Sequence, residues 1–320
     1  MKNAITIDLE DYYQVSAFAN DVAVDQWDSF PSRVEANTER LLSIFDDFGV
    51  KATFFTLGWV ARKYPRLVRD IANRRHEIAC HSNVHRPVNA MAPDEFRNDT
   101  LQSKHVLEDV SGERVYGYRA PSFSITRNSL WAFEILAELG FSYDSSVFPI
   151  KHPNYGWPRA PRFPFTIKTA SGSITEFPMP TVVMAGVRSP LAGGAYLRLL
   201  PYWYTQWGIR HINDIEGRSA CIYLHPWELD SEQPRMKGSI SAHLRHYFGL
   251  GRAELKIRRL LRDFQVQPLC ALIEELKSDY SSAAHERLPE VHLENLEQFL
   301  NQELEESNIL KAIAKPTDPL

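Results

Sequence analysis

Two histidines four residues apart and a cluster of carboxylates are the residues of this sequence that could perform chemistry together. His81 and His85 follow a short apolar run, and a helical turn after that run would aim both imidazoles at one point. Asp8, Glu10 and Asp11 end another apolar run, where three negative charges are unfavourable unless a cation or water offsets them. Two neutral imidazoles and one carboxylate are a common ligand set for a divalent transition metal. The pattern predicts a metal site with a second carboxylate free to act as a general base.

An arginine and a third histidine stand at the ends of two further apolar runs. Arg119 comes shortly before a proline, where a guanidinium could hold a carboxylate in place and keep it ionised. His225 is followed directly by a proline, which ends its run and presents the imidazole at the mouth of a predicted strand. Taken alone, Arg119 fits a surface residue and His225 a structural histidine. The neighbours Trp227 and Glu228 favour a site around His225.

All of these candidates follow predicted strands, so the fold decides whether they meet. Strand-like and helical runs alternate through the first half of the chain, which is typical of right-handed crossovers around a parallel sheet. In such folds the functional residues gather at the carboxyl ends of the strands. The predicted strands are 4–8, 52–57, 77–80, 114–118, one beginning at 141, and 220–224; the predicted helices are 33–48, 60–73, 93–110, 127–139, 195–212, 239–248, 253–264 and 269–278.

Two parts of the chain depart from this alternation. Residues 149–190 are rich in proline and glycine, and residues 165–177 have the pattern of a hairpin. The C-terminal stretch places leucines among many acids and indicates one more amphipathic helix near 288–304. That helix could pack on its own barrel or on a second copy in a homo-oligomer. We therefore expect an α/β barrel-like domain over residues 1–264 and a helical extension over residues 265–320.

Composition narrows the class of protein. The 320 residues suffice for one α/β barrel, which takes about 250. A formal net charge of -4 gives no reason to expect a nucleic-acid partner, because phosphate binding needs clustered Lys and Arg. We find no secretory signal and no run of about 18 apolar residues, and we expect no transmembrane segment and a cytoplasmic protein that can reach the inner membrane face. Cys80, Cys221 and Cys270 are odd in number, which favours buried thiols over disulfides.

Five segments stand out in chain order: Thr6-Ile7-Asp8 with the acids that follow, His81-Ser82-Asn83-Val84-His85, Arg119-Ala120-Pro121, Asp144-Ser145-Ser146 and Tyr223-Leu224-His225. Together they resemble the polysaccharide deacetylase family, carbohydrate esterase family four. A narrower resemblance, to the branch associated with exosortase and exopolysaccharide synthesis, is carried by Asp8-Leu9-Glu10-Asp11-Tyr12, Tyr118-Arg119-Ala120-Pro121-Ser122-Phe123, Tyr143-Asp144-Ser145-Ser146 and His225-Pro226-Trp227-Glu228. The resemblance covers residues 4–264 and implies a distorted (β/α) barrel of about seven strands.

Two positions depart from the family's pattern. The adjacent Asp-Asp of the family is replaced by Asp8-Leu9-Glu10-Asp11, so two acids compete for the place of the carboxylate ligand. Related branches favour Glu10, with Asp11 as the fallback. Tyr223 stands where leucine is usual, and we expect it to change the shape of the pocket rather than its acid chemistry.

The resemblance implies a metal-dependent hydrolase that removes N-acetyl groups from an amino-sugar polymer or oligosaccharide in exopolysaccharide biosynthesis. Glu10, His81 and His85 would bind a divalent metal, and zinc is the default for histidine-rich sites. Asp8 would take the proton from the attacking water. Arg119 would orient Asp8 for this step.

The leaving group needs a proton and the sugar needs a binding surface. His225, as an imidazolium, would donate the proton to the leaving amine, and Asp144 would pair with His225 to keep it charged. Asp144 could instead be only a turn residue. Tyr155, Trp157 and Trp227 could stack on sugar rings, although aromatic side chains in loops more often complete the edge of a core.

Two other functions stay open at this stage. Similar barrels occur in allantoinase-like amidohydrolases, some without metal, so the substrate could be a small cyclic amide or ureide. The insert at 149–190 favours a larger substrate. A catalytically silent carbohydrate-binding barrel is the other alternative. It is disfavoured by His225 and by the intact residues of the predicted metal site, because a binding module needs no general acid.

Overall fold

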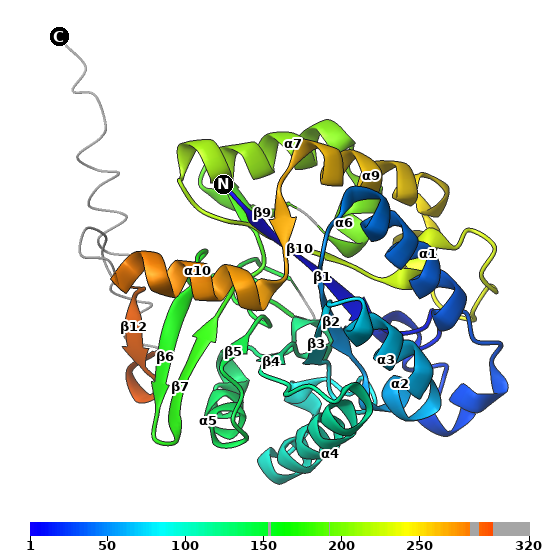
Figure 1. The fold of residues 1–320 in the computed structure, drawn as a ribbon, viewed down its shortest axis with the longest axis horizontal. Helices are drawn as coiled ribbons and strands as arrows, with labels where there is room; N and C mark the ends of the chain where they lie inside the picture. Colours follow the sequence, from blue (N-terminus) through cyan, green and yellow to red (C-terminus); the bar gives the residue numbers. More distant parts are fainter. Residues whose placement is uncertain (153–154, 192, 282–287, 297–320) are drawn as a thin grey trace.

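A mostly parallel sheet surrounded by helices forms the centre of the computed structural model, which describes residues 1–152, 155–191, 193–281 and 288–296 (Figure 1). Seven neighbouring strands, in the order β10-β1-β2-β3-β4-β5-β7, are all parallel, in agreement with the predicted (β/α) barrel of about seven strands. β6 continues the sheet antiparallel to β7, β12 pairs with β6, and β11 pairs with β1. β8 and β9 form a separate hairpin. The strands are β1 (Asn3–Leu9), β2 (Thr53–Thr56), β3 (Glu77–Cys80), β4 (Gly117–Tyr118), β5 (Tyr143–Asp144), β6 (Phe165–Thr169), β7 (Gly172–Glu176), β8 (Thr181–Met184), β9 (Val187–Pro190), β10 (Cys221–Leu224), β11 (Val266–Gln267) and β12 (Glu290–His292).

The helices follow from apolar positions at helical spacing and from the residues that stop them. The predicted helix at 33–48 is α1, and it ends at Gly49, whose left-handed φ of 63° suits a residue without a Cβ. The predicted helix at 93–110 is α4, which ends in the same way at Gly112. The helices are α1 (Val34–Phe48), α2 (Gly58–Lys63), α3 (Pro65–Asn73), α4 (Pro93–Ser111), α5 (Trp131–Glu138), α6 (Gly194–Leu199), α7 (Tyr202–Arg210), α8 (Ile240–Tyr247), α9 (Ala253–Asp263) and α10 (Leu269–Ser281).

Prolines divide two helices that the sequence predicts as continuous. The segment 60–73 forms α2 and α3, with a break at Tyr64 before Pro65. The segment 195–212 is divided at Pro201 into α6 and α7. Proline has no N–H to continue a helix, but its fixed φ suits a helix start, so each proline ends one helix and begins the next.

The C-terminal part differs from the expected helical extension. Just beyond the predicted boundary at 264, β11 adds to the sheet beside β1, and α10 follows. Glu290–His292 is the strand β12, not a helix, because a single buried residue, Val291, stands between two exposed ones in the two-residue period of a strand. The rest of the predicted helix, residues 297–304, lies outside the described residues, and the domain boundary stays a prediction.

The strand register brings the predicted site residues to one edge of the sheet. Leu9 lies beside Thr56, Thr56 beside Cys80, Cys80 beside Tyr118, and Tyr118 beside Asp144. The strands are parallel, so the residues that follow these positions emerge side by side. Because both faces of β1 and β2 are buried, these strands are apolar and threonine-rich throughout rather than alternating.

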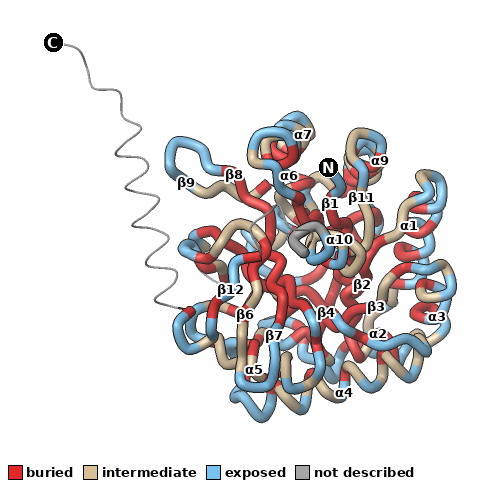
Figure 2. The backbone as a smooth tube through the Cα atoms, turned by 60° about the vertical axis from the view of Figure 1, so that its left-hand side comes forward, coloured by how far each residue is buried: buried red, intermediate tan, exposed pale blue. Residues whose placement is uncertain are grey.

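Burial follows the same plan. The strands at the centre are buried and the outer helices are exposed along their solvent side (Figure 2). The main core joins the outward side chains of the central strands, such as Ile5, Ile7 and Phe54, to the inner faces of the helices. No helix within the described ranges is long and apolar enough to cross a membrane.

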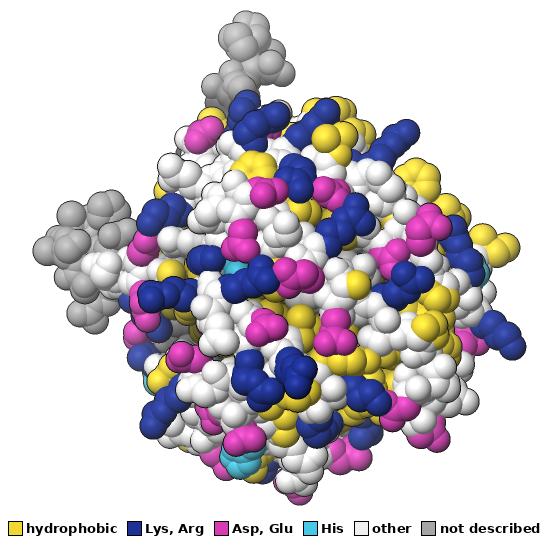
Figure 3. Space-filling view, turned by 45° about the vertical axis from the view of Figure 1, so that its right-hand side comes forward, with side chains coloured by type: hydrophobic (Ala, Val, Ile, Leu, Met, Phe, Trp, Pro, Cys, Tyr) yellow, Lys and Arg dark blue, Asp and Glu magenta, His cyan; other side chains and the backbone are white. Residues whose placement is uncertain are grey.

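Charged side chains of both signs are interspersed over the face seen in Figure 3. Ion pairs connect neighbouring helices on the surface: Arg40 of α1 pairs with Glu254 of α9, and Arg74 beyond α3 pairs with Asp46 of α1. Exposed pairs of this kind are each worth about 0–1 kcal/mol, so burial of the core contributes far more to the fold.

Candidate active site

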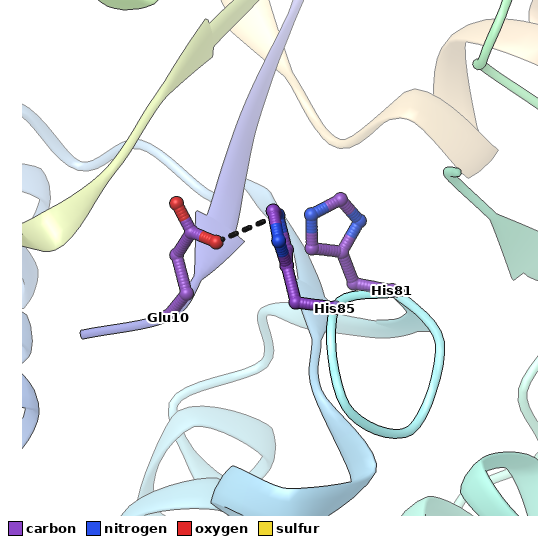
Figure 4. A group of neighbouring side chains, drawn as sticks. All are labelled: Glu10, His81 and His85. Atoms are coloured by element: carbon purple, nitrogen blue, oxygen red, sulfur yellow. Dashed lines mark ion pairs between the residues drawn. The ribbon is translucent and has the colours of Figure 1, made fainter. Parts of the chain in front are cut away.

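Three side chains from two strand ends converge on one point. Glu10 follows β1, while His81 and His85 lie in the loop after β3, and Figure 4 shows both imidazoles turned toward the carboxylate. One ligand atom of each residue lies within 4.8 Å of those of the other two, and all three side chains are buried. The closest pair is Nε2 of His85 and Oε2 of Glu10, 2.9 Å apart. The sequence-predicted ligands are therefore brought together.

The loop that carries the two histidines is not the expected helical turn. Ser82 and His85 both have left-handed φ values, 65° and 55°, which are uncommon for residues with a Cβ. The loop is fixed by hydrogen bonds: the N–H of His85 donates to Oγ of Ser82 at 3.0 Å, and the N–H of Asn83 donates to Asp99 at 2.8 Å. These contacts hold a strained backbone so that both rings face the same point.

His81 is held in the tautomer that suits a ligand. Its Nδ1 lies 2.8 Å from the carbonyl oxygen of Arg119, and a carbonyl can only accept, so Nδ1 carries the proton and Nε2 keeps its lone pair. Burial lowers the pKa of His81 to about 4. The imidazole is therefore neutral near pH 7, as a metal ligand must be.

The two candidate carboxylate ligands have different surroundings. Burial acts to raise the pKa of Glu10, but the attraction of the nearby His85 outweighs burial and lowers that pKa to about 2. Asp11 points elsewhere, because its Oδ2 accepts hydrogen bonds from Oγ of Ser32 at 2.7 Å and from the backbone N–H of Arg33 at 2.8 Å. A third donor is the N–H of Val34, at the start of α1. The fallback choice, Asp11, is thus engaged in capping a helix, and Glu10 is the acid that faces the histidines.

Asp8 and Arg119 form a buried ion pair beside this cluster. Nη1 of Arg119 donates to Oδ1 of Asp8 at 2.7 Å and to the hydroxyl of Thr6 at 2.8 Å. The guanidinium also donates to the carbonyl and hydroxyl oxygens of Ser145 and lies 4.1 Å above the ring of Phe55. Burial acts to lower the pKa of Arg119, but the charge of Asp8 outweighs it and the pKa is raised. The expected contact between Arg119 and Asp8 is present.

His225 lies across from the cluster, at the end of β10. Its Nε2 is 3.6 Å from Oε1 of Glu10 and 3.9 Å from Oδ2 of Asp8. Its Nδ1 is 2.6 Å from Oε1 of Glu228, in the 3₁₀ turn Pro226–Leu229. Burial acts to lower the pKa of His225, but the hydrogen bond and charge of Glu228 outweigh it and raise the pKa. The side chain is 15% exposed, so it can reach a molecule in the pocket.

The carboxylate that pairs with His225 is that of Glu228. The sequence analysis expected Asp144 in this role, and that expectation is wrong. Asp144 is fully buried, and its carboxylate accepts hydrogen bonds from the hydroxyl and the N–H of Ser146. It lies against Glu176, and burial raises the pKa of both acids, so the pair shares a proton rather than carrying two charges. Asp144 thus holds the segment from which Ser145 reaches Arg119.

The sequence analysis named Glu228 as a neighbour of His225 but gave it no role, and it did not identify Arg198. Arg198 of α6 is buried, and its Nε lies 3.5 Å from Oε2 of Glu228. Its Nη1 donates to the carbonyl oxygens of His246 and Phe248. The spacing of His225 and Glu228, three residues apart after a proline, was a usable signal for Glu228. Arg198 comes from a distant helix and had no such signal.

A cavity of about 260 Å³ opens over these residues. It is lined by Asp8, the three clustered side chains and His225, and two of the three predicted sugar-binding aromatics, Tyr155 and Trp227, also line it. Trp227 is stacked between the rings of His225 and His246 and donates from Nε1 to Glu10 at 3.3 Å. Trp157 was placed wrongly, because it is buried in the main core and is not among the residues that line the cavity.

Two family profiles match consecutive segments of this chain. The polysaccharide deacetylase profile matches residues 20–143, and residues 145–274 match a domain of unknown function, DUF3473. A peptidoglycan-N-acetylglucosamine deacetylase of Bacillus cereus is 36% identical over 98 residues, which is 30% of this chain and 36% of that protein. A peptidoglycan deacetylase of Helicobacter pylori is 30% identical over 115 residues, covering 35% and 38%.

The matched segments span little more than a third of those curated relatives. A crystal structure from Mycobacterium smegmatis, provisionally assigned as a polysaccharide deacetylase, has the same fold over nearly the whole chain. Its TM-score is 0.55 at 22% identity, and the match covers 91% of this chain and 94% of that one. The chain therefore contains a polysaccharide deacetylase domain, which is followed by the DUF3473 region that is typical of the exopolysaccharide-associated branch.

Proposed function

We propose that this protein is a metal-dependent hydrolase that removes N-acetyl groups from an acetylated amino-sugar polymer or oligosaccharide. The observation that carries the proposal is the convergence of Glu10, His81 and His85 on one point, with His225 on the opposite side of the same cavity. Hydrolysis of an acetamide needs an activated water and a proton donor for the amine, and this arrangement offers groups for both.

The donor set of the cluster fits a divalent cation. Oε2 of Glu10 is buried and receives no well-aligned hydrogen bond from the described residues, although Nε2 of His85 is only 2.9 Å away. Nε2 of His81 keeps its lone pair, because the proton is on Nδ1, which donates to the carbonyl oxygen of Arg119. Two nitrogen donors and one carboxylate oxygen suit zinc and leave a position for substrate. An ion held there would act as a Lewis acid that activates water and polarises a carbonyl.

Asp8 is the general base in this proposal. Its Oδ1 is occupied by Arg119, while Oδ2 faces the cavity and His225. The guanidinium fixes the orientation of Asp8, so the free oxygen can accept a proton from a water that attacks the acetyl carbonyl.

His225 is the general acid. It must be protonated before the carbon–nitrogen bond breaks, and Glu228 favours that state by accepting a hydrogen bond from Nδ1. Nε2 then carries a proton toward the cavity and delivers it to the sugar nitrogen as the amine leaves. Arg198 holds the other oxygen of Glu228 in place.

The relatives support a polymeric acetylated substrate, because the Bacillus cereus protein is named for peptidoglycan N-acetylglucosamine. The DUF3473 region supports the further proposal that the polymer is an exopolysaccharide in the course of synthesis. The DUF3473 region supplies His225, Glu228 and Arg198. The proposed general acid and the residues that support it therefore belong to the region that distinguishes this branch.

The test is metal analysis of the full chain followed by acetate release from N-acetylated chito-oligosaccharides. We expect the zinc-loaded protein to release acetate, and Asp8→Asn and His225→Ala to lose that activity while keeping the metal. His105→Ala, an exposed histidine on α4, serves as the matched control. Intact hydrolysis in Asp8→Asn would refute the proposed role of Asp8. Turnover of allantoin but not of the sugar amides would favour a small ureide as substrate.

A further inference from the structure

One wall of the cavity is formed by a tyrosine at a position where the family usually has leucine. Tyr223 of β10 stands two residues before His225, lines the cavity and packs its ring 5.7 Å from that of His225. The start of α6 makes room for it: a Cβ on Gly193 would lie 2.1 Å from Cδ1 of Tyr223, and a Cβ on Gly194 would lie 2.8 Å from its hydroxyl oxygen. The glycine pair and the tyrosine thus form one built feature.

An arginine without a carboxylate partner stands in the same wall. Arg245 of α8 is exposed and lines the cavity, and its Nη2 donates to the hydroxyl oxygen of Tyr155 at 3.1 Å. Its guanidinium also lies 5.6 Å from the centre of that ring. Arg198, the other cation of the lining, lies beside Glu228, whereas Arg245 forms no ion pair within the described part of the chain.

Further phenol groups can serve as hydrogen-bond donors in this part of the protein. The hydroxyls of Tyr155 and Tyr196 lie 3.2 Å apart. Burial raises the pKa of Tyr223 well above its ordinary value, and that of Tyr196 also rises, so both phenols stay protonated and able to donate. On the other side of the cavity, Asp8 is already paired with Arg119, and Glu10 belongs to the proposed metal site. Among the described residues that line this pocket, Arg245 is therefore a charged side chain without an oppositely charged partner.

We infer that Tyr155, Tyr223 and Arg245 form a subsite for an acidic group, namely the carboxylate of a sugar acid next to the N-acetylated sugar that is hydrolysed. The inference rests on the proposed function and narrows its substrate class to acidic amino-sugar polymers. A planar guanidinium held by a tyrosine offers two parallel N–H groups to a carboxylate, and phenol donors beside it fit the remaining lone pairs. A neutral polymer would offer no opposite charge to Arg245.

The test compares two oligosaccharides of equal length: one alternates N-acetylglucosamine with glucuronic acid, and the other contains only N-acetylglucosamine. Binding is measured by isothermal titration calorimetry with the zinc-loaded full chain in an Asp8→Asn background, which prevents turnover. We expect the acidic oligosaccharide to bind about tenfold more tightly than the neutral one, the size of one charge-assisted hydrogen bond. Adding Arg245→Gln should remove that preference, and adding Arg259→Gln, an exposed arginine on α9 outside the cavity, should preserve it.

Equal binding of the two oligosaccharides, or a preference that survives Arg245→Gln, would overturn the subsite. Raising the salt concentration should reduce the preference, because a charge contact at a partly open pocket is screened. Acetate release by the unsubstituted protein is measured separately with both oligosaccharides. Preferential binding without any acetate release would refute the proposed hydrolase and leave the subsite standing. Acetate release without preferential binding would support the proposed hydrolase and refute the subsite.

Discussion

The two sides of the cleft are held by different kinds of contact. On the side of the proposed metal ligands, called the metal side, Glu10, His81 and Arg119 follow β1, β3 and β4 of the parallel sheet, and the backbone register fixes where each one lies. On the opposite side, called the acid side, lies the proposed general acid His225. It also follows a strand, but its orientation depends on side chains: Glu228 in the next turn and Trp227 stacked on its ring. A register is set by many backbone hydrogen bonds, whereas a side-chain contact can be removed by one substitution.

The same difference appears along the sequence. The polysaccharide deacetylase profile ends at residue 143 and contains the histidine loop and Arg119, while DUF3473 contains His225 and its supports. Glu10 and Asp8 precede the matched residues but join them through β1. We infer that the metal side tolerates little change, and that the acid side is where this chain can adjust its pH dependence and its substrate.

The largest effect is expected from breaking the metal side. In the double variant His81→Ala and His85→Ala, two of the three proposed ligands are lost, and bound zinc measured by mass spectrometry should fall from stoichiometric to trace. Acetate release should fall by about 10³-fold or more, because a Lewis acid contributes several kcal/mol to such a reaction. Stoichiometric zinc in the double variant would contradict the ligand assignment.

Breaking the acid side should leave the metal bound. His225→Ala removes the proton donor, and we expect kcat for chito-oligosaccharides to fall by about 10²–10⁴-fold with zinc content unchanged. His243→Ala, a neighbouring histidine on α8 that does not line the cavity, is the control. Loss of zinc together with activity in His225→Ala would mean that the two sides of the cleft are not separable.

A smaller effect should come from removing the support of His225. Glu228→Gln takes away the charge that raises the pKa of the imidazole, so the protonated form is lost at a lower pH. Because His225 is the proposed general acid, the alkaline limb of the pH profile of kcat should move to lower pH. The rate at pH 8 should fall by up to about tenfold. Glu232→Gln, an exposed acid nearby, should leave the limb in place, and an unmoved limb in Glu228→Gln would show that another group holds the proton on His225.

The same distinction explains how much could be predicted from the sequence. The parallel sheet and the meeting of Asp8, Glu10, His81 and Arg119 follow from apolar strands that each end in a polar residue, and this pattern is visible in one dimension. The partner of His225 was assigned wrongly. Asp144 also follows the strand pattern, but its burial beside Glu176 depends on a hairpin whose contacts the sequence does not specify.

The remaining errors have local physical causes. Two predicted helices are interrupted, one at Tyr64 before Pro65 and the other at Pro201. The apolar spacing continues across both breaks, so periodicity alone predicts single helices. β12 is too short to outweigh the helical pattern of its neighbours. Arg198 and Arg245 join the cavity only because α6 and α8 pack over it, and no spacing in the chain indicates that packing.

The smallest expected effect concerns the acid that the structure removes from the metal site. Asp11→Ala deletes the acceptor for two backbone N–H groups at the start of α1, and loss of such a cap lowers the free energy of unfolding by about 1–2 kcal/mol. Urea unfolding of the metal-free protein should show this decrease, while Asp25→Ala, an exposed acid, should not. Zinc stoichiometry should stay unchanged in Asp11→Ala and fall in Glu10→Ala. The opposite pattern would make Asp11 the ligand, and the metal side would then depend on a helix start as well as on strand register.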